Sequence, residues 1–194
     1  MFFFQILQKK KGAMFMELKG SRTEANLMAA VEGESVAYTK YTLYAASARQ
    51  EGYEQIGAIF DETAKNEKEH AEIWLNYLHG GNLSGTKGNL QDAAGGEHFE
   101  WSKMYRDFAQ VAKSEGFSEI ATKMELIAKI EKSHEERYQK LISNLERGVV
   151  FEGSAETVWI CRNCGYIYEG KEPPAVCPVC SVPRSYFERK ATNY

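Results

Sequence analysis

A pattern of carboxylates and a histidine occurs twice in this chain at nearly the same spacing. In each copy a Glu is followed, 33 or 34 residues later, by a second Glu that has a His three positions beyond it. The two copies are Glu34, Glu67 and His70, and Glu97, Glu131 and His134. Two helical hairpins that each supply one Glu and one Glu-x-x-His provide the ligands of a di-iron or di-manganese centre inside a four-helix bundle. The spacing therefore predicts a dinuclear metal site on repeated hairpins.

Long helices must position these ligands, and helical patterns fill most of residues 22–147. Gly80-Gly81 ends the second helix and is followed by a loop rich in Gly, Ser and Asn. Gly116 ends the third helix, and Ser118 is the expected N-cap of the fourth. The expected helices are 23–51, 53–79, 90–115 and 118–147.

The predicted ligands fall on the apolar stripe of each helix. In the fourth helix the stripe has an uninterrupted 4-3-4-3-4-3 spacing, and such a heptad stripe faces the core of a bundle. Its members are Ile120, Met124, Ile127, Glu131, His134, Tyr138 and Leu141. The second helix repeats the pattern with Tyr53, Ile56, Phe60, Thr63, Glu67, His70, Trp74 and Tyr77. The first and third stripes are Leu27, Ala30, Glu34, Ala37 and Tyr41, and Leu90, Ala93, Glu97, Glu100 and Met104.

Five carboxylates and two imidazoles are thus predicted to point into one core. Burial of unpaired carboxylates costs several kcal/mol each, and no stripe position carries Lys or Arg. Metal ions are the natural counter-charge, and oxygen and nitrogen ligands suit iron or manganese. We expect Glu67 and Glu131 to bridge two metals, Glu34 and Glu97 to be terminal ligands, His70 and His134 to approach one metal each, and Glu100 to be additional.

Other polar residues near these positions have simpler interpretations. His98 lies about 100° around the helix from Glu97 and is expected at the surface. His79 precedes Gly80-Gly81, where the helix dipole favours a basic residue. Tyr41 and Tyr105 are aromatic core residues or, alternatively, hydrogen-bond donors to the carboxylate ligands.

All four cysteines lie near the C-terminus, in two Cys-x-x-Cys pairs, and this clustering predicts one tetrahedral metal site. The set is Cys161, Cys164, Cys177 and Cys180. Spacing alone does not separate zinc, in a structural ribbon, from iron. Trp159, Tyr168 and Phe187 are expected to wrap the site, and a di-iron bundle needs an electron source, so we favour iron. Thiolate sites persist in reducing compartments, which predicts a cytoplasmic protein.

Composition limits the other classes of function. The chain has 194 residues and a net charge of −3, which gives no basic surface for nucleic acid. No apolar run is long enough to span a membrane. We divide the chain into an N-terminal extension of unknown role at 1–20, a helical bundle at 21–147, a linker at 148–157 and a small metal-binding domain at 158–194. For the apolar start of the extension, we favour a non-functional segment over a membrane or partner anchor.

These residues together resemble the rubrerythrin family. The resemblance rests on Glu32-Gly-Glu-Ser35, Glu67-x-x-His70, Glu97-x-x-Glu100-Trp101, Glu131-x-x-His134-Glu-Glu-Arg-Tyr138 and the Cys161 to Cys180 knuckles. It implies a mainly α fold, with a ferritin-like four-helix bundle followed by a small rubredoxin-like β domain. It also implies two non-haem irons in the bundle and one iron on four Cys.

The activity that the resemblance implies is a peroxidase acting in oxidative stress defence. It would reduce hydrogen peroxide to water with electrons that pass through the rubredoxin-like site. The electrons would come from an NADH- or NADPH-dependent reductase, often through a separate rubredoxin. In the family, the residue matching Glu100 binds one iron in the oxidised state, and the residue matching His70 replaces it on reduction. Family members commonly form head-to-tail dimers with electron transfer between subunits, so we expect a homodimer or larger oligomer.

Two other functions use parts of the same pattern. A ferroxidase or iron-storage protein shares the bundle but does not need the cysteines. A zinc-ribbon interaction protein would have a purely structural bundle. Metal content and colour discriminate among these, because a ferric tetrathiolate is red and a zinc tetrathiolate is colourless.

Overall fold

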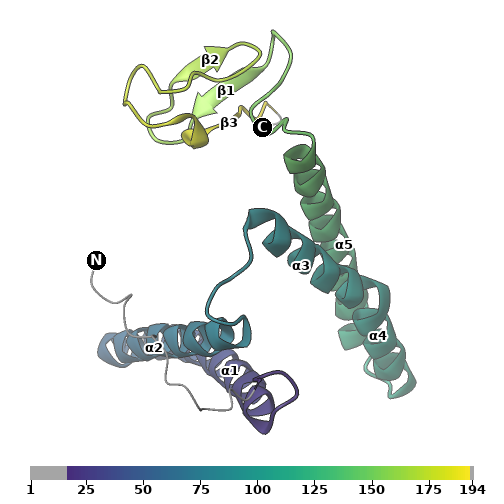
Figure 1. Cartoon of the computed structure of the whole chain (residues 1–194). Helices are drawn as coiled ribbons and strands as arrows, with labels where there is room; N and C mark the ends of the chain where they lie inside the picture. The colour runs from purple at the N-terminus through teal and green to yellow at the C-terminus, as the bar shows by residue number, and fades with distance from the viewer. Residues whose placement is uncertain (1–16, 193–194) are drawn as a thin grey trace, which may run out of the picture. The chain divides into compact units, whose positions relative to one another are not determined.

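The structure, a computed structural model, describes residues 17–192, in two compact units divided between Leu83 and Ser84 (Figure 1). Residues 1–16 of the predicted N-terminal extension lie outside the described residues. No helix within 17–192 is long and apolar enough to cross a membrane.

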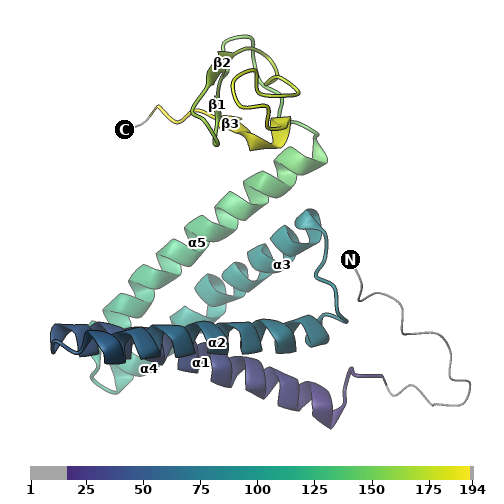
Figure 2. The ribbon, with the colours of Figure 1, turned by 90° about the vertical axis from the view of Figure 1, so that its left-hand side faces the viewer.

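The first unit is a hairpin of helices α1 (Arg22–Gln50) and α2 (Glu54–Leu78), which lie side by side in both ribbon views (Figures 1 and 2). Ser21 is the N-cap of α1, and its hydroxyl accepts a hydrogen bond from the Glu24 N–H. The helices approach each other through small residues, because a Cβ at Gly57 would lie 3.1 Å from the Ala45 carbonyl oxygen. The buried residues of the hairpin are Ala45, Ala48, Gly57 and Ala64.

The second unit begins with α3 (Thr86–Phe99), a π-helical turn η1 (Glu100–Met104) and α4 (Tyr105–Ser114), which together pack against α5 (Ser118–Glu146). The third predicted helix therefore begins four residues earlier than expected, at Thr86. Gly85 is its N-cap, and Lys87 in its first turn forms a 2.8 Å ion pair with Glu146 of α5. This helix is also not a continuous α-helix, because the π-helical turn interrupts it.

The predicted N-cap at Ser118 is wrong by one residue. Gly116 adopts a left-handed conformation, with φ of 88°, and the Phe117 N–H then closes on the Ala112 carbonyl. The Phe117 carbonyl already accepts from the Ala121 N–H, so Phe117 is the N-cap and Ser118 is the first helical residue.

The chain ends in a small antiparallel sheet of β1 (Val158–Cys161), β2 (Ile167–Glu169) and β3 (Phe187–Arg189), in the order β2-β1-β3. A 3₁₀ turn, η2 (Arg184–Tyr186), precedes β3. Trp159 and Phe187 are almost fully buried in the core of this C-terminal domain, with Tyr168 packed against them. The prediction that these three aromatic residues surround the cysteine site is confirmed.

Candidate metal centres

The first metal-binding group lies within the α1–α2 hairpin. Glu34 comes from α1, while Glu67 and His70 come from α2, where a spacing of three residues places both on one face. One ligand atom from each of the three lies within 4.8 Å of the others. The His70 Nδ1 lies 2.9 Å from Glu67 and 3.8 Å from Glu34.

The second group, in the α3–α5 unit, repeats this geometry almost unchanged. Glu97 comes from α3, while Glu131 and His134 come from α5. The His134 Nδ1 lies 2.8 Å from Glu131 and 3.5 Å from Glu97. Partial burial raises the pKa of Glu97, and the negative charge of Glu131 raises it further. A cation placed among these carboxylates would relieve that repulsion.

Glu100 lies outside both groups of three, at the first residue of the π-helical turn. In this turn the Tyr105 N–H bonds to the Glu100 carbonyl five residues back. Tyr105 therefore takes the place one turn above Glu100 that an α-helix would give to Met104, the residue predicted on the heptad stripe. Partial burial raises the pKa of the Tyr105 phenol, as do the charges of Glu100 and Glu131. The phenol is thus a neutral donor beside two carboxylates.

Tyr41 has a different environment, in the α1–α2 hairpin. Its ring centroid lies 6.2 Å from that of Tyr44 and 6.0 Å from that of Phe60. These contacts make it part of an aromatic cluster, as the simpler prediction for this residue expected. His79 is the C-cap of α2, which agrees with its predicted place at the helix end.

Residues next to the second group connect α5 to the π-helical turn through hydrogen bonds. The Trp101 indole N–H donates to Glu135, which immediately follows His134. His98 contacts the same carboxylate at 3.1 Å and lies edge-on to the Trp101 ring. His98 is largely exposed, as predicted, but sequence reasoning missed its partners. The Trp101 and His98 hydrogen bonds both lower the pKa of Glu135, which keeps it ionised.

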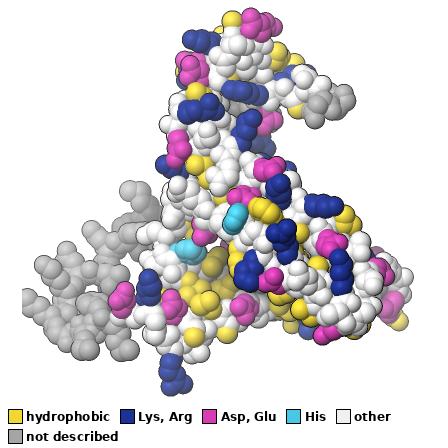
Figure 3. Space-filling view, turned by 90° about the vertical axis from the view of Figure 1, so that its right-hand side faces the viewer, with side chains coloured by type: hydrophobic (Ala, Val, Ile, Leu, Met, Phe, Trp, Pro, Cys, Tyr) yellow, Lys and Arg dark blue, Asp and Glu magenta, His cyan; other side chains and the backbone are white. Residues whose placement is uncertain are grey.

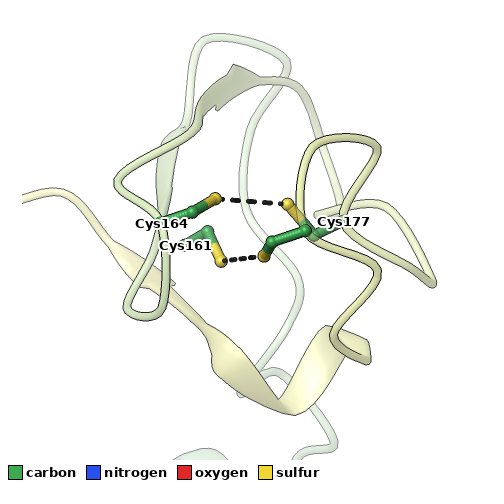
Figure 4. Close-up of side chains that lie close together, drawn as sticks. Cys161, Cys164 and Cys177 are labelled. Carbon is green, nitrogen blue, oxygen red and sulfur yellow. Dashed lines mark hydrogen bonds between the residues drawn. The ribbon is translucent and has the colours of Figure 1, made fainter.

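The four cysteines form one compact cluster. The Sγ atoms of Cys161 and Cys180 are 3.8 Å apart, and those of Cys164 and Cys177 are 3.7 Å apart (Figure 4). These separations are far longer than a disulfide bond of about 2.05 Å. A tetrahedral metal with metal–sulfur bonds of about 2.3 Å requires sulfur–sulfur edges of about 3.8 Å. The cluster therefore has the dimensions of a tetrathiolate metal site.

Two knuckles with the same backbone pattern build this cluster. The N–H of the first Cys of each knuckle bonds to the carbonyl five residues later, at Tyr166 or Val182. The residue after each knuckle then returns a bond to that Cys and has a left-handed conformation, with φ of 78° at Gly165 and 61° at Ser181. Ser181 is the one non-glycine residue within 17–192 with positive φ, a conformation that goes with the hydrogen bonds of its own knuckle.

The sulfurs of the cluster differ in acidity. The Asn163 side chain lowers the pKa of Cys180 to about 6, and the Val182 backbone contributes to this shift. For Cys164, a hydrogen bond from the Tyr166 backbone lowers the pKa, but desolvation and the other three sulfurs outweigh it and raise the pKa to about 12. A cation at the centre would stabilise all four sulfurs as thiolates.

The fold and these sites define a ferritin-like metalloprotein with a rubredoxin-like domain. The family model described as rubrerythrin matches residues 25–142, and the model of the rubrerythrin rubredoxin-like domain matches residues 159–188. The chain belongs to the rubrerythrin family, which is of the oxidoreductase type. The carboxylate–histidine groups and the four-Cys site fit the iron binding of this family.

Individual relatives match over nearly the whole chain. Rubrerythrin of Porphyromonas gingivalis is 46% identical, with 96% of this chain and 98% of that protein covered. Rubrerythrin of Nitratidesulfovibrio vulgaris is 41% identical, with coverage of 91% and 98%. A solved structure of nigerythrin in a mixed-valence state is 30% identical, covers 96% of this chain and 98% of its own, and has a TM-score of 0.33.

Proposed function

We propose that the protein is a non-haem di-iron peroxidase that reduces hydrogen peroxide to water. One peroxide, two electrons and two protons give two waters, so the reaction needs both an electron store and an electron supply. The observation that carries the proposal is that one chain holds two Glu–Glu–His groups and a four-sulfur cluster with the dimensions of a tetrathiolate metal site. A ferroxidase would need only the first of these features.

In this proposal the two groups of three would together hold two irons. Glu67 and Glu131 would be the shared carboxylates, because each precedes a His on its own helix and is the less exposed carboxylate of its group. Glu34 and Glu97 would be terminal ligands, and His70 and His134 would be the histidine ligands. When bound, the irons supply Lewis acidity and the two electrons for O–O cleavage.

Glu100 and Tyr105 are the residues that we propose to act around the metals. Glu100 supplies an extra negative charge, which would stabilise the oxidised, more positive site, while His70 would take its place on reduction. This role of Glu100 is supported by its charge, which raises the pKa of both Glu97 and Tyr105. Tyr105 would donate a hydrogen bond to a carboxylate ligand and so hold its orientation. Tyr41 would do the same from α1, although its known contacts are aromatic.

Electrons would enter through Cys161, Cys164, Cys177 and Cys180 from an NADH- or NADPH-dependent reductase, directly or through rubredoxin. Iron is the metal proposed there, with zinc as the colourless alternative. The helix from His134 to Arg147 carries the chain roughly 20 Å along α5, away from its own ligands. Transfer to a neighbouring chain in a homodimer, in a reducing cytoplasm, is therefore the route that we propose.

The test is a coupled assay with purified protein, rubredoxin, a rubredoxin reductase and NADH. Peroxide-dependent NADH oxidation should require all components, and iron analysis should give three irons per chain. The proposal fails if fully iron-loaded protein consumes no peroxide beyond a single turnover while the reductase demonstrably reduces its sulfur site.

A further inference from the structure

The ligand-bearing face of each helical unit is left partly open. On the heptad stripe of α2, Ile56 and Tyr77 are 46% and 61% exposed, and on that of α5, Ile120 and Leu141 are 49% and 43% exposed. Hydrophobic side chains are visible at the surface among charged ones (Figure 3). Both units bury mainly alanines, so their large apolar side chains still need a partner.

The metal ligands are divided in the same way. Each unit supplies two carboxylates and one imidazole within 4.8 Å, which is half of a ligand set for two metals. The surface that completes either half must therefore carry an apolar stripe with a second Glu–Glu–His group. The α3–α5 unit carries such a surface, which could complete the site of α1–α2. The α1–α2 hairpin likewise carries the surface that could complete the site of α3–α5.

The connection between the two units is short. Only residues 79–85 join the end of α2 at Leu78 to the start of α3 at Thr86. The first of these residues close back on α2, because Gly80 and Gly81 have positive φ and the Gly81 N–H bonds to the Asn76 carbonyl. Even fully extended, the connection spans at most about 29 Å.

A ferritin-like bundle formed by one chain needs a longer connection at this point. Its order includes one long crossover, which returns the chain to the far end of the bundle before the third helix begins. The 25 residues of α2 are about 37 Å long, so the connection cannot run the length of this helix. Closure within one chain would require α2 and α3 to be antiparallel neighbours, which is not the ferritin-like order.

We infer that the four-helix bundle is completed between two copies of the chain, with α1–α2 of one copy packed against α3–α5 of the other. Each dimer then has two bundles, and each dinuclear centre takes Glu34, Glu67 and His70 from one chain and the second group of three from its partner. The exchange is a closed two-fold arrangement, so no apolar stripe remains open. The iron measurement below rests on the proposed di-iron ligand set. The subunit measurement that follows it rests only on the length of the connection between α2 and α3.

The first test is complementation between full-length variants. Glu67→Ala and Glu131→Ala chains are co-expressed with different affinity tags, and mixed dimers are isolated by tandem purification. With exchanged hairpins, one bundle of the mixed dimer contains both substitutions and the other contains neither. The mixed dimer should hold half of the wild-type bundle iron, measured as total iron minus the red tetrathiolate iron. Closure within each chain predicts no bundle iron, and that result would overturn the inference.

The matched control pairs Glu34→Ala with Glu67→Ala, which both lie in α1–α2. No intact site can form from this pair in either arrangement, so bundle iron should be absent. Iron in this control would show that a single ligand is dispensable, which contradicts the proposed ligand set and not the exchange.

The second test needs no metal. Twelve Gly and Ser residues inserted between Gly81 and Asn82 would let a single chain make the crossover, so iron-free dimers carrying different tags should exchange subunits much faster, as measured by native mass spectrometry, because no bundle would then have to open. The same insertion after Gly153 lengthens the chain outside the helices and should leave the exchange slow. A monomeric parent protein, or equal exchange rates for the two insertions, would overturn the inference.

Discussion

The Trp101 indole N–H donates a 2.5 Å hydrogen bond to the Glu135 carboxylate, joining the residue after Glu100 to the residue after His134. The bond connects the π-helical turn to α5 beside one of the two metal-binding groups. Removing it should weaken the α3–α5 packing without removing a metal ligand.

Trp101→Phe should destabilise the protein by about 1–2 kcal/mol, because a hydrogen bond to a charged group is lost while most ring packing is kept. The measurement is urea unfolding followed by circular dichroism. A double-mutant cycle with Glu135→Gln isolates the pair. Glu136→Gln is the control, since Glu136 is 67% exposed and pairs with Lys132 at 3.7 Å, a weaker contact. Equal effects of Glu135→Gln and Glu136→Gln would contradict a stabilising role.

Glu131→Ala should abolish iron binding in the bundle while the tetrathiolate site stays red. The substitution removes a proposed bridge and leaves His134 without its 2.8 Å neighbour. Iron analysis combined with visible absorption separates the two sites. Glu125→Ala, which removes another α5 carboxylate that pairs with Lys113, should keep both. Two bundle irons in the Glu131 variant would show that this carboxylate is not a bridge.

Glu100→Ala should slow peroxide turnover by about 10–100-fold, the usual effect of losing a group that supports a metal centre. Iron content should fall much less, because both groups of three remain. The measurement is the peroxidase rate per bound iron. Glu100→Gln, which keeps the size but not the charge, should behave like the Ala variant. An unchanged rate at full iron loading would make Glu100 an ordinary half-buried acid.

Cys161→Ser should separate the two sites functionally. A pre-reduced bundle should still react once with peroxide, because that reaction needs only the proposed di-iron centre. Steady-state NADH oxidation should fall sharply, because the relay is broken. Stopped-flow single turnover and the coupled assay measure the two quantities. Undiminished steady-state turnover would mean that the sulfur site is structural or bypassed.

Mixing Cys161→Ser with Glu131→Ala chains tests transfer between subunits. Each variant should be inactive alone in steady-state turnover. A mixed dimer pairs one intact sulfur site with one intact α5 ligand set on the other chain, so part of the activity should return. Native mass spectrometry confirms that mixed dimers are present. Their complete inactivity would place electron transfer within single chains.

Much of the site could be predicted because helix geometry is local. A spacing of three residues places Glu67 beside His70, and Glu131 beside His134, wherever the helix packs. The four cysteines were predictable for the same reason, since each knuckle is a short turn that brings its two sulfurs together. The four helices followed from the heptad stripe, to within a few residues at their ends.

The remaining features depend on tertiary packing. No heptad count reveals that a π-helical turn replaces Met104 with Tyr105 above Glu100, because the stripe reads equally well as a continuous α-helix. The Trp101–Glu135 bond spans 34 residues, so neither residue indicates its partner in the sequence. The alanines that let the helices approach look like any other helical alanines in the sequence. Sequence determined which residues bear the chemistry, through short-range periodicity. Tertiary structure decided the π-helical turn and the long-range contacts around the ligands, because these arise only where distant segments pack.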